Sequence, residues 1–229
     1  MARHTEAAMS SARKETLEAI RTALVGSEPR TSEHLQELKA RIQESVPHLQ
    51  PQLDGDLLTH FCEKHIAVHG TYERVGRAGV ATAVLHHLDS LGIPPELLVG
   101  AGPILDQVQW PEQVVVERRS ANKDDSVALS EAFAGIAESG TVVLLPGAGR
   151  PSSHNFLPED HIIVVDCARI VRHQEDAWTL VRALPGQAAR TIQLITGPSK
   201  TGDIEQAIQY GAHGPRRVHL VIVEDRDDA

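Results

Sequence analysis

The sequence contains few aromatic residues and few cysteines, and both shortages narrow the class of protein. Only 3% of the 229 residues are aromatic while 41% are hydrophobic, so a buried core must be built mainly from Leu, Ile, Val and Ala. Cys62 and Cys167 stand alone and far apart, which excludes a disulfide framework and a Cys-x-x-Cys metal site. Both are expected to be buried thiols in a reducing cytosol.

Positive charge and long apolar segments are also scarce. The chain has 22 Lys and Arg against 31 Asp and Glu, a formal net charge of -9, which argues against nucleic acid or an anionic membrane as a partner. No apolar run approaches the roughly 20 residues that cross a bilayer, so no membrane span is expected. Residues 1–19 lack the apolar core of a secretion signal, and we expect a cytoplasmic protein.

The common motifs for cofactors and nucleophiles are absent. There is no Gly-x-Gly-x-x-Gly fingerprint for a dinucleotide and no Gly-x-Ser-x-Gly elbow. The phosphate-loop spacing before Lys200-Thr201 fails because Leu194 and Ser199 occupy its glycine positions. We therefore expect no cofactor held by a recognisable motif in this chain.

A metal site is not expected either. Cys62, His65 and His69 have helical spacing, but a strand predicted over residues 66–68 would separate them. The ligand spacings of known zinc motifs are also missing.

Residues 1–50 differ from the remainder and predict a helical arm. Apolar residues recur at helical spacing in two short stripes, which are Leu17, Ile20 and Leu24, then Leu35, Leu38 and Ile42. Such narrow stripes are typical of surface helices. We interpret the arm as cladding; the alternative is an element that docks a partner.

From residue 51 onward predicted helices and strands alternate, which indicates an α/β domain over residues 51–229. Residues 142–145 and 162–165 are continuously apolar, which is typical of strands buried on both faces. The predicted fold is an open, mostly parallel sheet covered by helices. The predicted helices cover residues 57–61, 80–91 (ended by Gly92), 126–137, 176–183 and 203–210. The predicted strands cover residues 66–68, 97–99, 114–116, 141–145, 162–166, 191–196 and 218–223.

The segment from Thr196 to Glu205 is the densest group of candidate ligand-binding residues. A buried strand is predicted to end here, turn through Gly197 and Pro198, and enter a helix. The start of that helix would offer unpaired N–H groups and the positive end of the helix dipole to an anion. The residues placed there are Ser199, Lys200, Thr201 and Asp203. The alternative is that a hydroxyl only caps the helix.

Three further features carry candidate chemistry, each with a structural alternative. Gly211 and Gly214 flank His213, which could exchange a proton near neutral pH or bond only to backbone. Glu138, just before a predicted buried strand, could act as nucleophile or base or fix the turn. Arg150 could clamp a carboxylate bidentately or be a solvated loop charge.

Taken together, these segments resemble the LUD domain, and specifically the lactate utilization protein C family. The resemblance covers roughly residues 56–225 and is strongest after Ala137. The segments that carry it are 137–141, Leu157-Pro158, His161-Ile162, 195–205, 211–215 and the predicted strand 218–223. Their order and spacing make the match more specific than any single motif.

The resemblance implies a NagB/RpiA/CoA transferase-like fold and a role in oxidising L-lactate to pyruvate together with two iron–sulfur proteins. It transfers no settled catalytic residue. One hypothesis is a non-redox component of that system, which binds a small anionic hydroxy or keto acid or organises the complex. A second is a stand-alone coenzyme A transferase-like or cyclo-ligase-like enzyme that uses Glu138 on an acyl or phosphorylated small molecule. A third is a non-catalytic adaptor. The residues leave open whether the chain is itself an enzyme.

Overall fold

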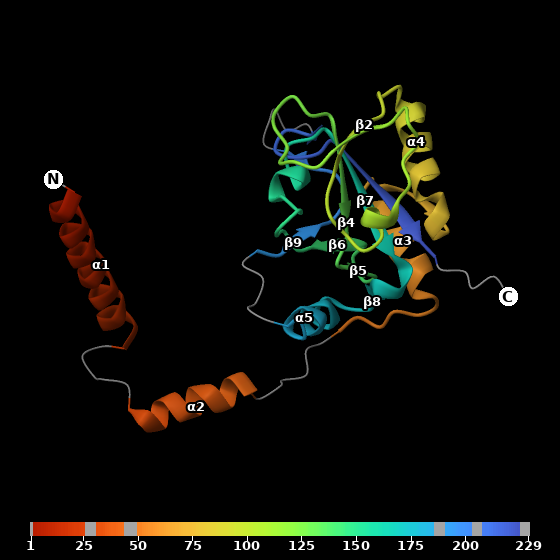
Figure 1. Cartoon of the computed structure of the whole chain (residues 1–229). Coiled ribbons are helices and arrows are strands. Elements are labelled where there is room, and N and C mark those ends of the chain that lie inside the picture. The colour runs from red at the N-terminus through yellow and green to blue at the C-terminus, as the bar shows by residue number, and fades with distance from the viewer. Residues whose placement is uncertain (1, 26–30, 44–49, 186–190, 203–207, 225–229) are drawn as a thin grey trace. The chain divides into compact units, whose positions relative to one another are not determined.

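A computed structural model describes residues 2–25, 31–43, 50–185, 191–202 and 208–224 (Figure 1). By its internal contacts the chain divides into two units, Met1–Leu49 and Gln50–Ala229. The first unit contains helices α1 (Ala2–Val25) and α2 (Ser32–Gln43), at the positions of the two predicted helices. Its apolar stripe is exposed, and Leu24 is 73% accessible.

The second unit is built on a six-stranded sheet in which every neighbouring pair of strands is parallel. In spatial order its strands are β1 (Thr71–Val75), β12 (Arg217–Val223), β7 (Asp160–Asp166), β4 (Val127–Glu131), β2 (Glu96–Val99) and β3 (Val115–Glu117). This confirms the predicted open, mostly parallel sheet. Strand β7 is buried on both faces, as the continuous apolar run over residues 162–165 predicted, and β12 is buried in the same way.

A smaller sheet of four strands packs beside the first. In spatial order it contains β8 (Ile170–Val171), β5 (Ala134–Ile136), β6 (Thr141–Leu144) and β9 (Gln193–Ile195). Strand β6 is antiparallel to both β5 and β9, whereas β5 and β8 are parallel. A separate two-stranded hairpin joins β10 (Lys200–Thr201) to β11 (Gln209–Tyr210).

Helices and the smaller sheet cover the parallel sheet on its two faces. Helix α4 (Val80–Leu91) packs on one face through Val80, Ala83, Val84 and Leu88. On the other face, helix α3 (Leu57–Ala67) and the smaller sheet share one apolar cluster with β7 and β12. Helix α5 (Gln174–Arg182) lies on the smaller sheet. Short 3-10 turns complete the domain: η1 (Arg77–Gly79), η2 (Leu105–Gln107), η3 (Ser152–Asn155) and η4 (Cys167–Arg169).

Three predicted elements are wrong. Residues 66 and 67 end helix α3, and the strand that follows begins at Thr71. Residues 126–137 form strands β4 and β5 rather than a helix, because Val127, Ala128 and Leu129 are buried in the middle of the sheet. In the predicted helix 203–210, residues 203–207 lie outside the described part and Gln209–Tyr210 is a strand.

Other predicted boundaries hold. Helix α4 ends at Gly92, whose φ of 64° is the left-handed conformation that glycine adopts without strain. Among the helices that the structure describes, none combines the length and apolarity that a bilayer span requires.

Candidate functional site

A cleft lies where strands β2 and β4 of the parallel sheet end, the edge at which open α/β sheets usually bind ligands. We call it the carboxyl-edge cleft. Its lining consists of Gly100, Ser130, Glu131, Leu144, Leu145, Pro146, Arg150, Pro151 and Asn155. The cavity volume is about 20 Å³, which is room for about one water molecule. A larger ligand therefore requires movement of a lining side chain, and Arg150 is the exposed one.

A hydrogen-bonded chain of uncharged side chains forms the inner wall of this cleft. Ser130 Oγ donates to Asn155 Oδ1 (3.3 Å), and Asn155 Nδ2 donates to Gln193 Oε1 on β9. His161 Nε2 lies 3.0 Å from Ser130 Oγ. Because the Ser130 hydroxyl already donates to Asn155, the imidazole is the donor in this contact. The wall therefore joins the two sheets through polar contacts.

His161 does not activate Ser130 as a nucleophile. The imidazole is fully buried, and burial lowers its pKa to about 3. A neutral imidazole that donates through Nε2 has no lone pair there to accept the serine proton. The arrangement can orient a bound group by hydrogen bonding, but it is not a serine–histidine dyad.

Arg150 stands at the mouth of the cleft on a tight loop. Backbone hydrogen bonds of 3.0 Å join Gly147 and Arg150 in both directions. Gly149 has a φ of 68°, and its carbonyl accepts from the Ala101 N–H at 2.7 Å, which fixes the loop to the chain after β2. Within the described residues, Arg150 has no ion-pair partner. Its guanidinium is thus available to an anion, and its role as a carboxylate clamp stays a prediction.

Glu131 has a structural role at the back of the cleft. Its Oε2 accepts from the N–H groups of Ile104 (2.8 Å) and Leu105 (3.0 Å) at the start of η2. Burial raises the pKa of this carboxyl, and the two N–H groups counteract that shift. A Cβ on Gly102 would lie 2.2 Å from the same oxygen, so only glycine fits there.

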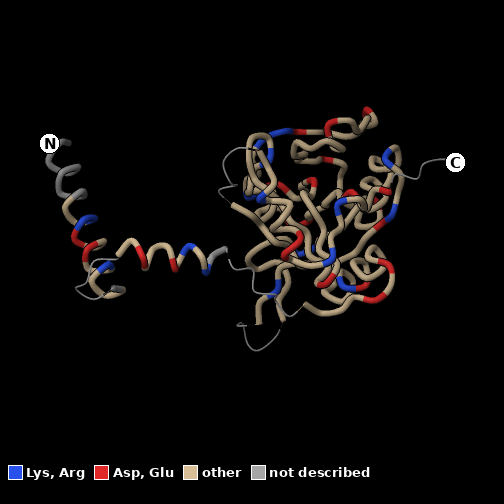
Figure 2. The backbone as a smooth tube through the Cα atoms, turned by 90° about the horizontal axis from the view of Figure 1, so that it is seen from below, with Lys and Arg blue, Asp and Glu red and all other residues tan. Residues whose placement is uncertain are grey.

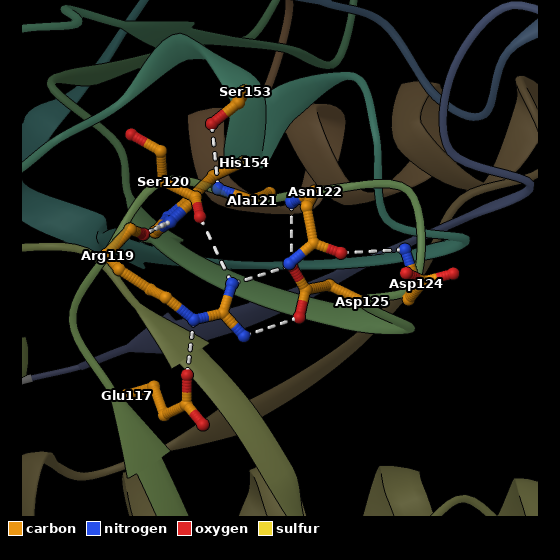
Figure 3. A network of polar contacts seen from close by, with 9 residues as sticks. All are labelled: Glu117, Arg119, Ser120, Ala121, Asn122, Asp124, Asp125, Ser153 and His154. Atoms are coloured by element: carbon orange, nitrogen blue, oxygen red, sulfur yellow. Dashed lines mark hydrogen bonds and ion pairs between the residues drawn. The ribbon is translucent and has the colours of Figure 1, made fainter.

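A charged network behind the cleft fixes η3 in place (Figure 3). Arg119 bridges Glu117 and Asp125, with two bonds of 2.8 and 2.7 Å to Asp125. This arginine lowers the pKa of Asp125 to about 2. His154 Nε2 donates to the Arg119 carbonyl at 2.7 Å, and Ser153 Oγ accepts from Ala121 N at 2.9 Å. The residue after His154 is Asn155, so the network positions the inner wall of the cleft.

Glu138 follows strand β5 and contacts the start of helix α5. Its Oε2 lies 2.6 Å from Nδ1 of His173, the N-cap residue of α5, and its N–H donates to the Arg172 carbonyl at 3.1 Å. The Glu138 side chain is 23% exposed and that of His173 is 8% exposed. The contact joins α5 to the smaller sheet. A role for Glu138 as nucleophile or base stays a prediction.

Glu138 and Arg150 lie at opposite ends of the smaller sheet. Strand β6 begins at Thr141, near Glu138, and ends at Leu144, ahead of Arg150. The hydroxyls of Ser139, Thr141 and Thr196 form two consecutive contacts of 2.7 Å at the first end. The structure therefore brings Glu138 near Thr196 but not near Arg150.

The segment after Thr196 is a hairpin and not a helix start. Lys200–Thr201 pairs antiparallel with Gln209–Tyr210. Ser199 N donates to the Pro215 carbonyl (2.9 Å), and Gly211 N donates to the Ser199 carbonyl (3.1 Å). Because Lys200–Thr201 is extended, no helix begins at Ser199–Thr201; a start at Asp203 lies outside the described residues, and the role of this segment in anion binding stays a prediction.

Gly197 and Pro198 attach this hairpin to helix α3. Gly197 has a φ of 72°, and a Cβ there would lie 2.6 Å from the carbonyl oxygen of Val68, the C-cap of α3. Pro198 is buried. The close packing therefore requires a glycine at this position.

The other predicted residues of this segment are mostly at the surface. Lys200 is exposed, with Nζ 5.7 Å from the ring of Tyr210. His213 is exposed, and Gly214 packs against Ser199. Asp203 lies outside the described residues.

The sequence reasoning missed the inner wall of the cleft. Ser130 lay in the predicted helix 126–137, and Asn155 and Gln193 received no role. Only His161 was noted, as part of the family resemblance. No local motif links these positions; the pairing of β4 with β7 and the packing of β9 bring them together.

The comparisons with known proteins agree with this fold. A family model described as the LUD domain matches residues 3–223. Lactate utilization protein C from Shouchella clausii is 25% identical over 213 residues, covering 86% of this chain and 92% of that protein. Lactate utilization protein C from Macrococcus caseolyticus is 32% identical over 124 residues, covering 53% and 54% of the two chains.

A solved structure has the same fold. The crystal structure of a DUF162 family protein from Deinococcus radiodurans superimposes with a TM-score of 0.57 at 20% identity, covering 76% of this chain and all of that one. The fold and its polar carboxyl edge define an α/β protein of the open parallel-sheet class. Since the family model spans nearly the whole chain, the chain belongs to the LUD domain family.

Proposed function

We propose that this chain is a cytoplasmic, non-redox component of an L-lactate utilization system and binds a small anionic hydroxy or keto acid in the carboxyl-edge cleft. The names of the similar proteins from Shouchella clausii and Macrococcus caseolyticus support the biological context. The position of Arg150 at the mouth of the cleft is the observation that supports the ligand class.

The cleft offers complementary groups for such a ligand. A guanidinium binds a carboxylate through two parallel N–H bonds. The second amide hydrogen of Asn155, which Gln193 does not occupy, can bond to a hydroxyl or keto oxygen next to that carboxylate, and the Ser130 oxygen can accept from a hydroxyl there. One anionic contact and one polar contact match the two functional groups of a 2-hydroxy or 2-keto acid.

In this proposal the electrons of lactate oxidation travel in iron–sulfur partner proteins. An iron–sulfur cluster is usually held by four cysteine thiolates, whereas the sequence contains two cysteines. The chain would present or sense the acid within the assembly. Deleting the gene should abolish growth on L-lactate and leave growth on glucose unchanged, and a tagged chain should co-purify iron–sulfur proteins; normal growth on L-lactate would contradict the proposal.

Calorimetric titration of the full chain with L-lactate and pyruvate tests the site directly. Arg150→Ala should weaken binding at least tenfold, and Arg150→Lys should recover only part of it because lysine lacks the fork geometry. Arg182→Ala removes the same charge from an exposed position on α5 and is the matched control. Equal affinity in Arg150→Ala and Arg182→Ala would rule out this cleft.

A further inference from the structure

A second, larger depression lies at the opposite edge of the parallel sheet, where β1 and β12 begin beside the end of helix α4. We call it the amino-edge groove. Its volume is about 460 Å³, within the range of small-molecule sites. Its lining includes Thr71, Leu91, Arg216, Arg217 and His219. None of them takes part in the carboxyl-edge cleft.

His219 in this groove has a buried nitrogen without a partner. The residue is 5% exposed, and its Nδ1 lies 2.9 Å from Thr71 Oγ1. Its Nε2 is buried and has no hydrogen-bond partner within the described residues. Leaving a buried polar atom unpaired is unfavourable by about 1–3 kcal/mol. This nitrogen has almost no exposed surface, so a ligand atom reaches it only after a neighbouring side chain at the groove moves.

The surrounding residues hold the His219 ring in place. The His87 ring stacks on it with centroids 4.0 Å apart and planes 18° apart. His87 Nε2 in turn lies 3.2 Å from the carboxylate of Asp160, which is fully buried, and Arg217 Nε donates to the same carboxylate at 2.7 Å. The imidazole is therefore part of a rigid polar assembly and not a mobile surface histidine.

The charges that face the groove favour an anion. Arg216 and Arg217 line it, and their contacts with the exposed Glu159 are long, at 3.7 and 3.5 Å. Exposed ion pairs of this kind are weak, so an anion in the groove can compete for both guanidinium groups. The one carboxylate of the lining, Glu73, lies 3.1 Å from His86. Asp160 lies beneath Arg217 and His87 and is absent from the lining.

Part of the lining is apolar. Tyr72, Leu91 and Val218 contribute to the wall, and Leu91 is 42% exposed. The hydrocarbon part of a small ligand would cover this apolar surface while its anionic group contacts the arginines.

We propose that the amino-edge groove binds a small organic anion whose charged group contacts Arg216 and Arg217 and accepts a hydrogen bond from His219 Nε2. This site is independent of the acid proposed for the carboxyl-edge cleft. Binding requires the tautomer in which Thr71 Oγ1 donates to Nδ1 and the ring proton sits on Nε2. The ligand thus selects one of two tautomers that the free protein permits.

Nuclear magnetic resonance of the full chain with ¹⁵N-labelled histidine tests the proposal, with phenyl phosphate, inorganic phosphate and the neutral benzyl alcohol as probes. Phenyl phosphate should shift the Nε2 resonance of His219 in a saturable manner, inorganic phosphate should do so more weakly, and benzyl alcohol should not. No saturable shift with either phosphate overturns the proposal, and so does an equal response to benzyl alcohol.

Two exposed substitutions keep the test independent of folding. Leu91→Glu places a negative charge in the groove and should weaken phenyl phosphate binding at least tenfold, whereas Leu184→Glu changes an equally exposed leucine elsewhere and should leave it unchanged. Unchanged affinity in Leu91→Glu contradicts the site. Arg150→Ala should not affect this titration, so failure of either site is distinguishable from failure of the other.

Discussion

The two edges of the parallel sheet contain buried polar side chains of different kinds. At the carboxyl edge, Ser130 and Asn155 form an uncharged chain that closes a cleft of water size, and His161 reaches Ser130 from the start of β7. At the amino edge, Asp160 and Arg217 form a buried charged contact under an open groove. An uncharged network can thus line a small cavity, whereas a buried charge such as that of Asp160 needs close partners and a solvent-facing arginine.

Both hydrogen-bonded networks nevertheless include a neutral buried histidine, and acid should destabilise the protein through both. Burial lowers the pKa of His161 and of His219 to about 3. Below pH 6.5 these two histidines take up protons in the unfolded chain but not in the folded chain. Their contribution to the free energy of unfolding is therefore fully present above that pH and is lost as the pH falls toward 3. Between pH 7 and pH 5 each histidine should cost about 2 kcal/mol of unfolding free energy.

Urea denaturation at pH 7 and pH 5 measures this effect. His161→Gln and His219→Gln should each reduce the acid-induced loss by about 2 kcal/mol, whatever they do to stability at pH 7. If one variant keeps the full acid-induced loss of unfolding free energy, the histidine that it replaces does not stay neutral on folding. If both keep it, the comparison fails.

The charged contact of the amino edge should be the more sensitive to a single substitution. Asp160→Asn keeps the side-chain size but removes the charge that partners Arg217 and His87. We expect a loss of about 3 kcal/mol in urea denaturation at pH 7. Asp124→Asn is the control, because that carboxylate is 76% exposed. A loss below about 1 kcal/mol would show that the buried charge contributes little.

The uncharged network of the carboxyl edge should be less sensitive. Asn155→Leu leaves the Ser130 hydroxyl and the Gln193 amide without their partner. The expected loss is about 2 kcal/mol, with Ser130→Ala as a milder companion near 1 kcal/mol. Losses that equal or exceed that of Asp160→Asn would reverse the order of the two edges.

The smallest effect is expected at the rim of the amino-edge groove. Glu73→Gln removes the exposed contact with His86, whose side chain is 72% accessible. Such contacts contribute less than about 1 kcal/mol, so the urea midpoint should hardly move. A large loss would mean that the rim takes part in the buried assembly.

The sequence predicted those parts of the fold whose signal is local. The apolar run at 162–165 became the central strand β7, the strand predicted over 218–223 became β12, and Gly92 ended α4. The helix over 126–137 was predicted from its Ala, Glu and Ser residues. It was wrong because burial on both faces made β4 a strand. The helix predicted over 203–210 was wrong at Gln209–Tyr210, which is a strand; it was predicted because a glycine-rich strand exit before acidic residues also fits a helix start.

The candidate site was less predictable than the fold. Arg150 was selected from the sequence for its chemistry, and it does line the cleft. Its neighbours Asn155, Gln193 and Ser130 come from separate segments, and only the register of two sheets places them together. Likewise, nothing near His219 in the sequence indicates Thr71 or His87.

The backbones of Gly140 and Gly197 pack against the C-terminal end of α3. A Cβ on Gly140 would lie 2.4 Å from the backbone nitrogen of His65, and a Cβ on Gly197 would lie 2.6 Å from the backbone oxygen of Val68. Both also have positive φ, so no L-amino acid with a side chain fits either position. In a saturation-mutagenesis screen for growth, these two glycines would therefore score as intolerant as Arg150. Growth data alone would therefore suggest an active site around α3. A separate measurement of protein abundance would distinguish the two packing positions from the binding position.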